Sequence, residues 1–266
     1  MGRKNIWDII GNQEVDICDE YKSLWYLFHN EKLINNPHRY NETFAEIARE
    51  KFLNFKTRGS ITSYDNFLQV LKLRPLIVKN GQELENLDLL IELILLVLSE
   101  LDDLQVPNIK NGIQIISDTI LSILEKTNQK IISLEDEKMI VVPNDEVITI
   151  VADLILPDDE KLALEVLGYS HYSNKDNLIE KRKILNSLAN YLEPKLKLQK
   201  NDEIGFVLNN YYIRHGNRQN KQNIERLSDE DMNSLYDKLY RDILYYLLEQ
   251  EHEDYKILVK KLKKNM

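Results

Sequence analysis

Apolar positions recur three and four residues apart along most of the chain, which is the spacing of helices that bury one face. In the first half this pattern predicts helices at about 17–29, 41–55, 60–74, 83–103 and 109–128. In the second half it predicts helices at about 144–155, 158–169, 175–192, 202–213 and 229–262. We therefore expect an all-α fold, mainly a helical bundle.

One segment departs from the helical period. Residues 130–142 read KIISLEDEKMIVV, in which two runs rich in β-branched residues flank the acidic turn Glu135–Glu137. Such a pair of runs predicts one short β-hairpin. We therefore divide the chain into an N-terminal helical region at 1–128, a hairpin connector at 129–143 and a C-terminal helical domain at 144–266.

The most apolar stretch runs from Leu89 to Leu98 and carries Glu92 in its middle. It is too short to span a bilayer, so we interpret it as a buried core helix and expect no membrane partner. From Glu83 to Asp103 there are seven acidic residues and no basic one. This pattern predicts an anionic rim, and one hypothesis is that the 1–128 region docks a basic partner through it.

Composition narrows the function classes. Cys18 is the only cysteine, which excludes an intrachain disulfide and a four-thiolate zinc site and favours a reducing, cytoplasmic location. The histidines at 29, 38 and 252 have no metal-ligand spacing, and no phosphate-binding glycine loop is present, so we expect no metal and no cofactor. A net charge of −9 argues against coating of nucleic acid by bulk electrostatics, so any RNA site must be local.

The most distinctive stretch is FVLNNYYIRHGNRQN, residues 206–220, which continues into a locally basic region. Residues 214–226, the basic segment, contain four cations and one acid, a net charge of +3 in an acidic protein. Cations of this kind bind phosphates, amides bind backbone or base edges, and a tyrosine stacks on an unpaired base. The candidate RNA-binding residues are Asn210, Tyr212, Asn217, Arg218, Lys221 and Arg226. The alternative is a solvated polar loop.

The order of elements resembles the C-terminal part of the abortive-infection AbiJ N-terminal family, a branch of the HEPN superfamily. The resemblance covers about residues 115–250 and rests chiefly on Ile213-Arg214-His215-Gly216, before a final long helix. It implies a HEPN-like helical domain, a homodimer, a role in antiphage defence and metal-independent endoribonuclease activity through Arg214 and His215. The usual HEPN signature separates these two residues by four to six positions, whereas here they are adjacent. The alternative is therefore a non-catalytic dimerisation or sensor module that binds RNA, a nucleotide or a partner defence protein.

The chemistry of this pair suits RNA cleavage. An imidazole titrates near neutrality and can carry the proton of a ribose 2′-hydroxyl, while a guanidinium can fork onto a phosphate. The competing interpretation is an ordinary helix end, with cations near the negative pole and Gly216 as the left-handed residue. His171 is interpreted as a capping or packing residue, and Tyr236 and Tyr240 as packing residues of the last helix.

Overall fold

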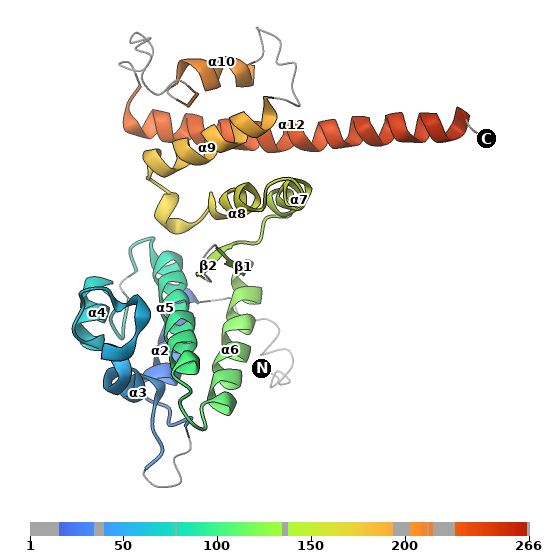
Figure 1. Ribbon diagram of the computed structural model, residues 1–266. Coiled ribbons are helices and arrows are strands. Elements are labelled where there is room, and N and C mark those ends of the chain that lie inside the picture. The colour runs from blue at the N-terminus through green and yellow to red at the C-terminus, as the bar shows by residue number, and fades with distance from the viewer. Residues whose placement is uncertain are drawn as a thin grey trace, which may run out of the picture. The chain divides into compact units, whose positions relative to one another are not determined.

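The protein is built almost entirely of helices (Figure 1). The structure, a computed structural model, describes residues 16–34, 40–77, 79–134, 138–193, 203–211, 213–214 and 227–264. One two-stranded sheet is present within those ranges, a hairpin of β1 (Gln129–Ser133) and β2 (Met139–Pro143). The prediction of a mainly helical fold with one short β-hairpin is confirmed.

The chain divides into two units, unit 1 (Met1–Val141) and unit 2 (Val142–Met266). The boundary falls within β2, so the hairpin that we treated as a connector is shared between the units. No helix of the described residues combines the length and hydrophobicity that a membrane span needs.

Unit 1 is organised around three helices, α2 (Ile17–His29), α5 (Glu83–Asp103) and α6 (Lys110–Thr127), with α2 packed against both others. Helix α3 (Phe44–Lys51) packs against α2, α4 (Tyr64–Val70) and α5. Two short 3-10 helices, η1 (Phe52–Asn54) and η2 (Lys56–Arg58), follow α3. The core is rich in fully buried aromatic side chains, namely Tyr21, Phe28, Phe44, Phe52 and Tyr64.

Polar caps account for where several helices begin. Asp16 accepts a hydrogen bond from the backbone N–H of Cys18 at 2.9 Å and starts α2. Thr43 and Glu46 bond each other's backbone N–H at 3.0 and 2.8 Å, a capping box that starts α3. Asn128, with φ of 53°, ends α6 in the left-handed region that asparagine tolerates better than most residues.

Unit 2 begins with α7 (Glu146–Ile155) and α8 (Glu160–Gly168), which pack against each other. The short helix η4 (Tyr172–Asn174) leads to α9 (Leu178–Leu192), and α10 (Glu203–Asn210) follows later in the chain. The last helix, α12 (Asp229–Lys264), packs against α7, α9 and α10. Tyr236 and Tyr240 lie in the core of this unit with 0% and 2% of their surface exposed, so the packing interpretation of these two residues is confirmed.

Two predictions from the sequence were wrong in detail. Helix α10 ends at Asn210 rather than at 213, because the backbone N–H of Arg214 donates to the carbonyl of Leu208 at 3.1 Å and closes a turn. The anionic rim of α5 is also smaller than expected, since Asp88 and Glu100 are only 4% exposed. Glu100 accepts hydrogen bonds from the backbone N–H groups of Lys56 and Thr57 at 2.9 and 2.8 Å, so it faces the interior.

Candidate functional site

The candidate site lies where the chain leaves α10. Tyr211, Ile213 and Arg214, which we call the anchored turn, follow the helix directly. The other predicted site residues, namely Tyr212, His215, Asn217, Arg218, Lys221 and Arg226, lie outside the described residues. Arg214 is thus both the last residue of the anchored turn and the first residue of the basic segment.

Arg214 is held against the end of α9. Its side chain is only 12% exposed, and its Nη2 donates to the carbonyl oxygen of Ala189 at 3.2 Å. Ala189 lies in the last turn of α9, where backbone carbonyls carry the negative pole of the helix and favour a cation. Nη1 lies 4.0 Å from Oε1 of Glu193, whose side chain is 67% exposed, so this ion pair contributes little.

Two other contacts fix the same turn. The phenol of Tyr236 on α12 donates to the carbonyl oxygen of Tyr211 at 3.0 Å, and Nε of Arg182 on α9 donates to that phenol oxygen at 3.2 Å. Ile213 is 3% exposed and belongs to the unit 2 core. The anchored turn is therefore tied to both α9 and α12 immediately before residue 215.

This geometry bears on the chemistry expected of Arg214. The sequence predicts a guanidinium free to fork onto a phosphate, whereas the structure directs one edge of it at a backbone carbonyl. Its Nε is buried and has no hydrogen-bond partner among the described residues. What the arrangement can do is hold the start of the basic segment in a defined place. Asn210, the other described candidate, donates from Nδ2 to the carbonyl of Phe206 at 2.7 Å and remains half-buried.

A second polar cluster in unit 2 was not predicted. Lys181 on α9 is 3% exposed, and its Nζ donates to Oδ1 of Asn233 and Oδ1 of Asp237, each at 2.7 Å. Tyr169 donates its phenol to the same Asp237 oxygen at 3.0 Å, and its ring lies 5.6 Å from Nζ of Lys181. The Tyr169 ring stacks on Tyr240 with 3.8 Å between centroids.

The ionisation of this cluster points to a structural role. Burial, followed by the nearby Asp237 carboxylate, raises the pKa of Tyr169 well above its ordinary value, so its phenol stays protonated and donates. A charged lysine and a neutral phenol then both bond one carboxylate. The cluster links the segment after α8 to α9 and α12.

His171 is a capping residue. It is 8% exposed, its Nδ1 lies 2.7 Å from the hydroxyl of Ser173, and it accepts from the backbone N–H of Ser173 at 3.3 Å. These contacts cap the start of η4.

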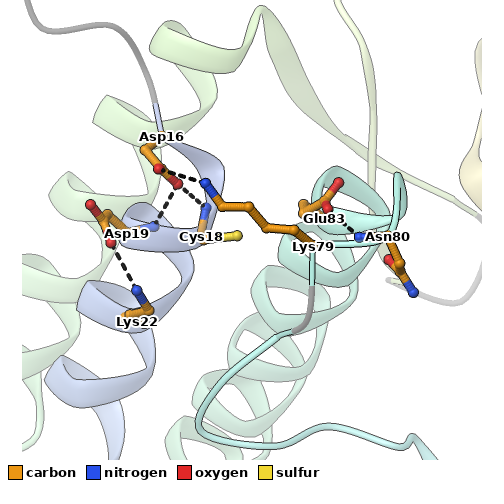
Figure 2. Close-up of polar contacts among 7 residues, drawn as sticks. All are labelled: Asp16, Cys18, Asp19, Lys22, Lys79, Asn80 and Glu83. Carbon is orange, nitrogen blue, oxygen red and sulfur yellow. Dashed lines mark hydrogen bonds and ion pairs between the residues drawn. The ribbon is translucent and has the colours of Figure 1, made fainter.

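In unit 1, Figure 2 shows polar contacts at the starts of α2 and α5. Nζ of Lys79 lies 3.2 Å from Oδ2 of Asp16, and this ammonium lowers the pKa of Asp16. Glu83 accepts from the backbone N–H groups of Asn80 and Gly81 at 2.5 and 3.1 Å. Cys18 contributes its backbone N–H here, so these contacts serve the helix starts. Across the described part of the chain, no group of three or more His, Cys, Asp and Glu side chains is arranged to hold a metal ion.

No protein-family model matches the chain, and no curated protein sequence or solved structure matches it either.

Proposed function

We propose that this protein is an antiphage-defence endoribonuclease of the HEPN type, which cleaves RNA without a metal ion at the basic segment. The observation that supports the proposal is the anchored turn, which fixes the backbone immediately before His215. Two hydrogen bonds hold this turn, from Arg214 to the carbonyl of Ala189 on α9 and from Tyr236 on α12 to the carbonyl of Tyr211. Arg182 on α9 donates in turn to the Tyr236 phenol. A proton carrier needs such a fixed position to act on one particular hydroxyl.

In the proposed reaction, the imidazole of His215 accepts the proton of a ribose 2′-hydroxyl. The resulting 2′-oxygen attacks the adjacent phosphorus and the bond from phosphorus to the 5′-oxygen breaks. The leaving 5′-oxygen takes a proton from water, and the protonated His215 gives its proton back to the solvent, so the products are a 2′,3′-cyclic phosphate and a 5′-hydroxyl. Arg218, Lys221 and Arg226 supply the positive charge that stabilises the phosphorane-like transition state.

Arg214 then has a positioning role. Its guanidinium bonds the carbonyl of Ala189 with 12% of the side chain exposed, which leaves little of it for a substrate phosphate. The loss of Arg214 is expected to displace His215 rather than to remove a substrate contact. Arg214→Lys should therefore keep part of the activity, because a lysine can still donate to Ala189, whereas Arg214→Ala should lose most of it.

The HEPN resemblance also gives the proposal its setting. We propose a homodimer that acts in the cytoplasm on cellular or phage RNA, with infection or a partner defence protein as the trigger. Neither a cofactor nor a membrane is required for this chemistry.

The decisive experiment compares the wild-type chain with His215→Ala in cells challenged with phage and, for the purified proteins, on total RNA in EDTA. We expect wild type to restrict growth and to leave cyclic-phosphate ends, and His215→Ala to lose both effects while keeping its thermal unfolding curve. The cleavage rate should fall as the pH is lowered, because a protonated His215 cannot accept the proton of the 2′-hydroxyl. Equal cleavage by wild type and His215→Ala would overturn the assignment of His215.

A second pair of variants tests the phosphate contacts at constant net charge. Arg218→Ala/Lys221→Ala/Arg226→Ala removes three cations from the basic segment, and Lys110→Ala/Lys161→Ala/Lys238→Ala removes three exposed cations elsewhere. We expect only the first variant to lose RNA affinity, by about 100-fold at low salt. Similar losses in the two variants would show that bulk charge, rather than this segment, attracts RNA.

The burial of Arg214 favours a second candidate, a non-catalytic module of the same type that binds RNA and senses it. In that case His215→Ala would leave RNA affinity unchanged and no cleavage would be seen with wild type, whereas the triple substitution in the basic segment would still abolish binding. The two candidates are therefore separated by the appearance of cyclic-phosphate ends.

A further inference from the structure

From Glu249 onward, no described side chain of α12 is buried. The helix is 36 residues long, and its last residue in the unit 2 core is Leu244, with Tyr246, Leu247 and Leu248 partly buried. Figure 1 shows α12 continuing past the other helices of unit 2 towards the C-terminus. From Glu249 to Lys263, every described side chain is exposed except Val259, which is half-buried.

This half nevertheless carries an apolar stripe. Tyr255, Leu258 and Leu262 are 61%, 54% and 57% exposed, and they continue the line of Leu244 and Leu248 along the helix. The spacing from 244 is four, then seven, three and four residues, which is the heptad spacing of a coiled coil with Glu251 at the omitted position. A solvated helical segment of about 15 residues is marginal by itself, so a covering partner would stabilise this half of α12.

Charge is distributed unevenly along the same half. Its first part carries Glu249, Glu251 and Glu253, and its second part carries Lys256, Lys260, Lys261 and Lys263. Within one chain, Glu253 and Lys256 form an ion pair at 2.6 Å. If two copies of this helix run antiparallel, the acidic part of each faces the basic part of the other. If they run parallel, like charges meet.

We propose that the projecting segment of α12, residues 248–263, forms an antiparallel two-helix coiled coil with the same segment of a second copy of this chain. The apolar stripe of Tyr255, Leu258 and Leu262 forms the seam, and the opposite charges of the two parts set the direction. This inference names a surface for the homodimer in the proposed function, but its argument and its test involve no RNA.

The first test uses a matched pair of neighbouring residues. Ile257 and Leu258 are similarly exposed, at 48% and 54%, but only Leu258 lies on the stripe. We expect Leu258→Asn to raise the dimer dissociation constant by about 30-fold or more, because each of two copies loses one buried leucine contact, and Ile257→Asn to have little effect. Sedimentation equilibrium of the full chain measures both. A monomeric wild type, or equal effects of the two variants, would overturn the proposal, whatever else the lysines bind.

Salt tests the direction of pairing. In the antiparallel arrangement the charges attract, so added salt should weaken the dimer, whereas in a parallel arrangement the charges repel and salt should strengthen it. Strengthening by salt would therefore exclude the antiparallel arrangement.

A charge exchange tests the complementarity itself. Glu249→Lys/Glu251→Lys/Glu253→Lys makes the segment almost wholly basic, and Lys256→Glu/Lys260→Glu/Lys261→Glu makes it largely acidic. We expect each variant alone to be monomeric and an equimolar mixture to form heterodimers. Failure of the mixture to associate would contradict a seam directed by charge. A chain that dimerises in these tests but cleaves no RNA would refute the proposed function and leave this interface standing.

Discussion

The two units bury charges of opposite sign. Unit 1 buries the carboxylates of Asp88 and Glu100, whereas unit 2 buries the ammonium of Lys181 and most of the guanidinium of Arg214. In unit 1 the carboxylates accept from loop N–H groups and from a side-chain amide, while in unit 2 the cations donate to side-chain and carbonyl oxygens. Helix ends explain two of these four groups, because N–H groups at the start of η2 bond Glu100 and a carbonyl at the end of α9 bonds Arg214. Asp88 and Lys181 are instead bonded by side chains.

The buried charged groups of the two units also differ in where they lie relative to the candidate site. Glu100 fixes the start of η2, and Glu92 together with Asp88, one helical turn away on α5, holds the hairpin through Val141 and Gln129 at 2.9 and 3.0 Å. These carboxylates bond other residues of unit 1 and therefore serve its structure. In unit 2 the guanidinium of Arg214 bonds the carbonyl of Ala189 at the end of α9, and Arg214 is the first residue of the basic segment.

The largest stability effect should come from Glu100. Its carboxylate accepts two backbone N–H groups and the Thr57 hydroxyl, the last at 2.6 Å, and Glu100→Ala would leave those donors without an acceptor. We expect a loss of about 4 kcal/mol in the free energy of unfolding of unit 1. Both tryptophans, Trp7 and Trp25, belong to unit 1, so their fluorescence in urea follows this unit. Asp102→Ala, an exposed position on the same helix, is the control; an equal loss there would contradict the role of Glu100.

The next effect concerns pH and unit 1. Burial against Trp25 lowers the pKa of His29 from 6.5 to about 4, and its ring stacks on Trp25 with 3.9 Å between centroids. Between pH 6.5 and about 4, His29 is therefore protonated in the unfolded chain but neutral in the folded chain. Stability from this group is complete above pH 6.5 and falls as pH drops to 4, by about 3 kcal/mol.

Substitution of His29 isolates that contribution. His29→Gln should lower stability at pH 7 but should flatten the decline between pH 6.5 and 4 relative to wild type, as measured by urea unfolding at several pH values. The same decline in both proteins would mean that acidic residues, rather than His29, set the acid sensitivity of unit 1.

In unit 2 the corresponding test is Asp237→Ala. This substitution leaves the buried Lys181 with the side-chain oxygen of Asn233 as an acceptor, but the Asp237 side chain is 43% exposed, so water compensates in part. We expect a loss of about 2 kcal/mol, less than for a fully buried pair. Hydrogen exchange of α9 and α12 measures it, with Asp242→Ala on the exposed side of α12 as control. The double variant Lys181→Met/Asp237→Leu should recover part of the loss, and a further loss would show that the pair itself stabilises the unit.

The local sequence pattern predicts the helices and the hairpin, but it does not predict the contacts between residues far apart in the chain. Helix α5 and the hairpin follow from their apolar runs, and Asp16, Thr43 and Asp159 cap helices at positions that short-range rules identify. The burial of Lys181 depends on Asp237, 56 residues later, and nothing in its own stretch of charged residues distinguishes it from its neighbours. The turn that follows α10 depends likewise on contacts from α9 and α12.

The candidate site shows the same limit. The pairing of Arg214 with His215 is readable as a motif, but the side-chain contact of Arg214 is made with α9, 25 residues earlier, and only the folded unit reveals it. The sequence therefore identifies which residues could take part in the chemistry. Whether such a residue contacts the substrate or positions another residue can be judged only from the tertiary structure.

The smallest expected effect on stability comes from Lys56, which makes both a buried backbone contact and an exposed ion pair. The backbone N–H of Lys56 bonds buried Glu100, while its ammonium pairs with Asp103 at 2.6 Å with the two side chains 77% and 52% exposed. Lys56→Met keeps the backbone bond and removes only the exposed ion pair, so we expect less than about 0.5 kcal/mol of destabilisation. Urea unfolding followed by tryptophan fluorescence, run beside Glu100→Ala, provides the measurement. A loss of similar size in the two variants would mean that η2 is held by its surface charge rather than by its backbone, and the contrast between buried and exposed carboxylates in unit 1 would fail.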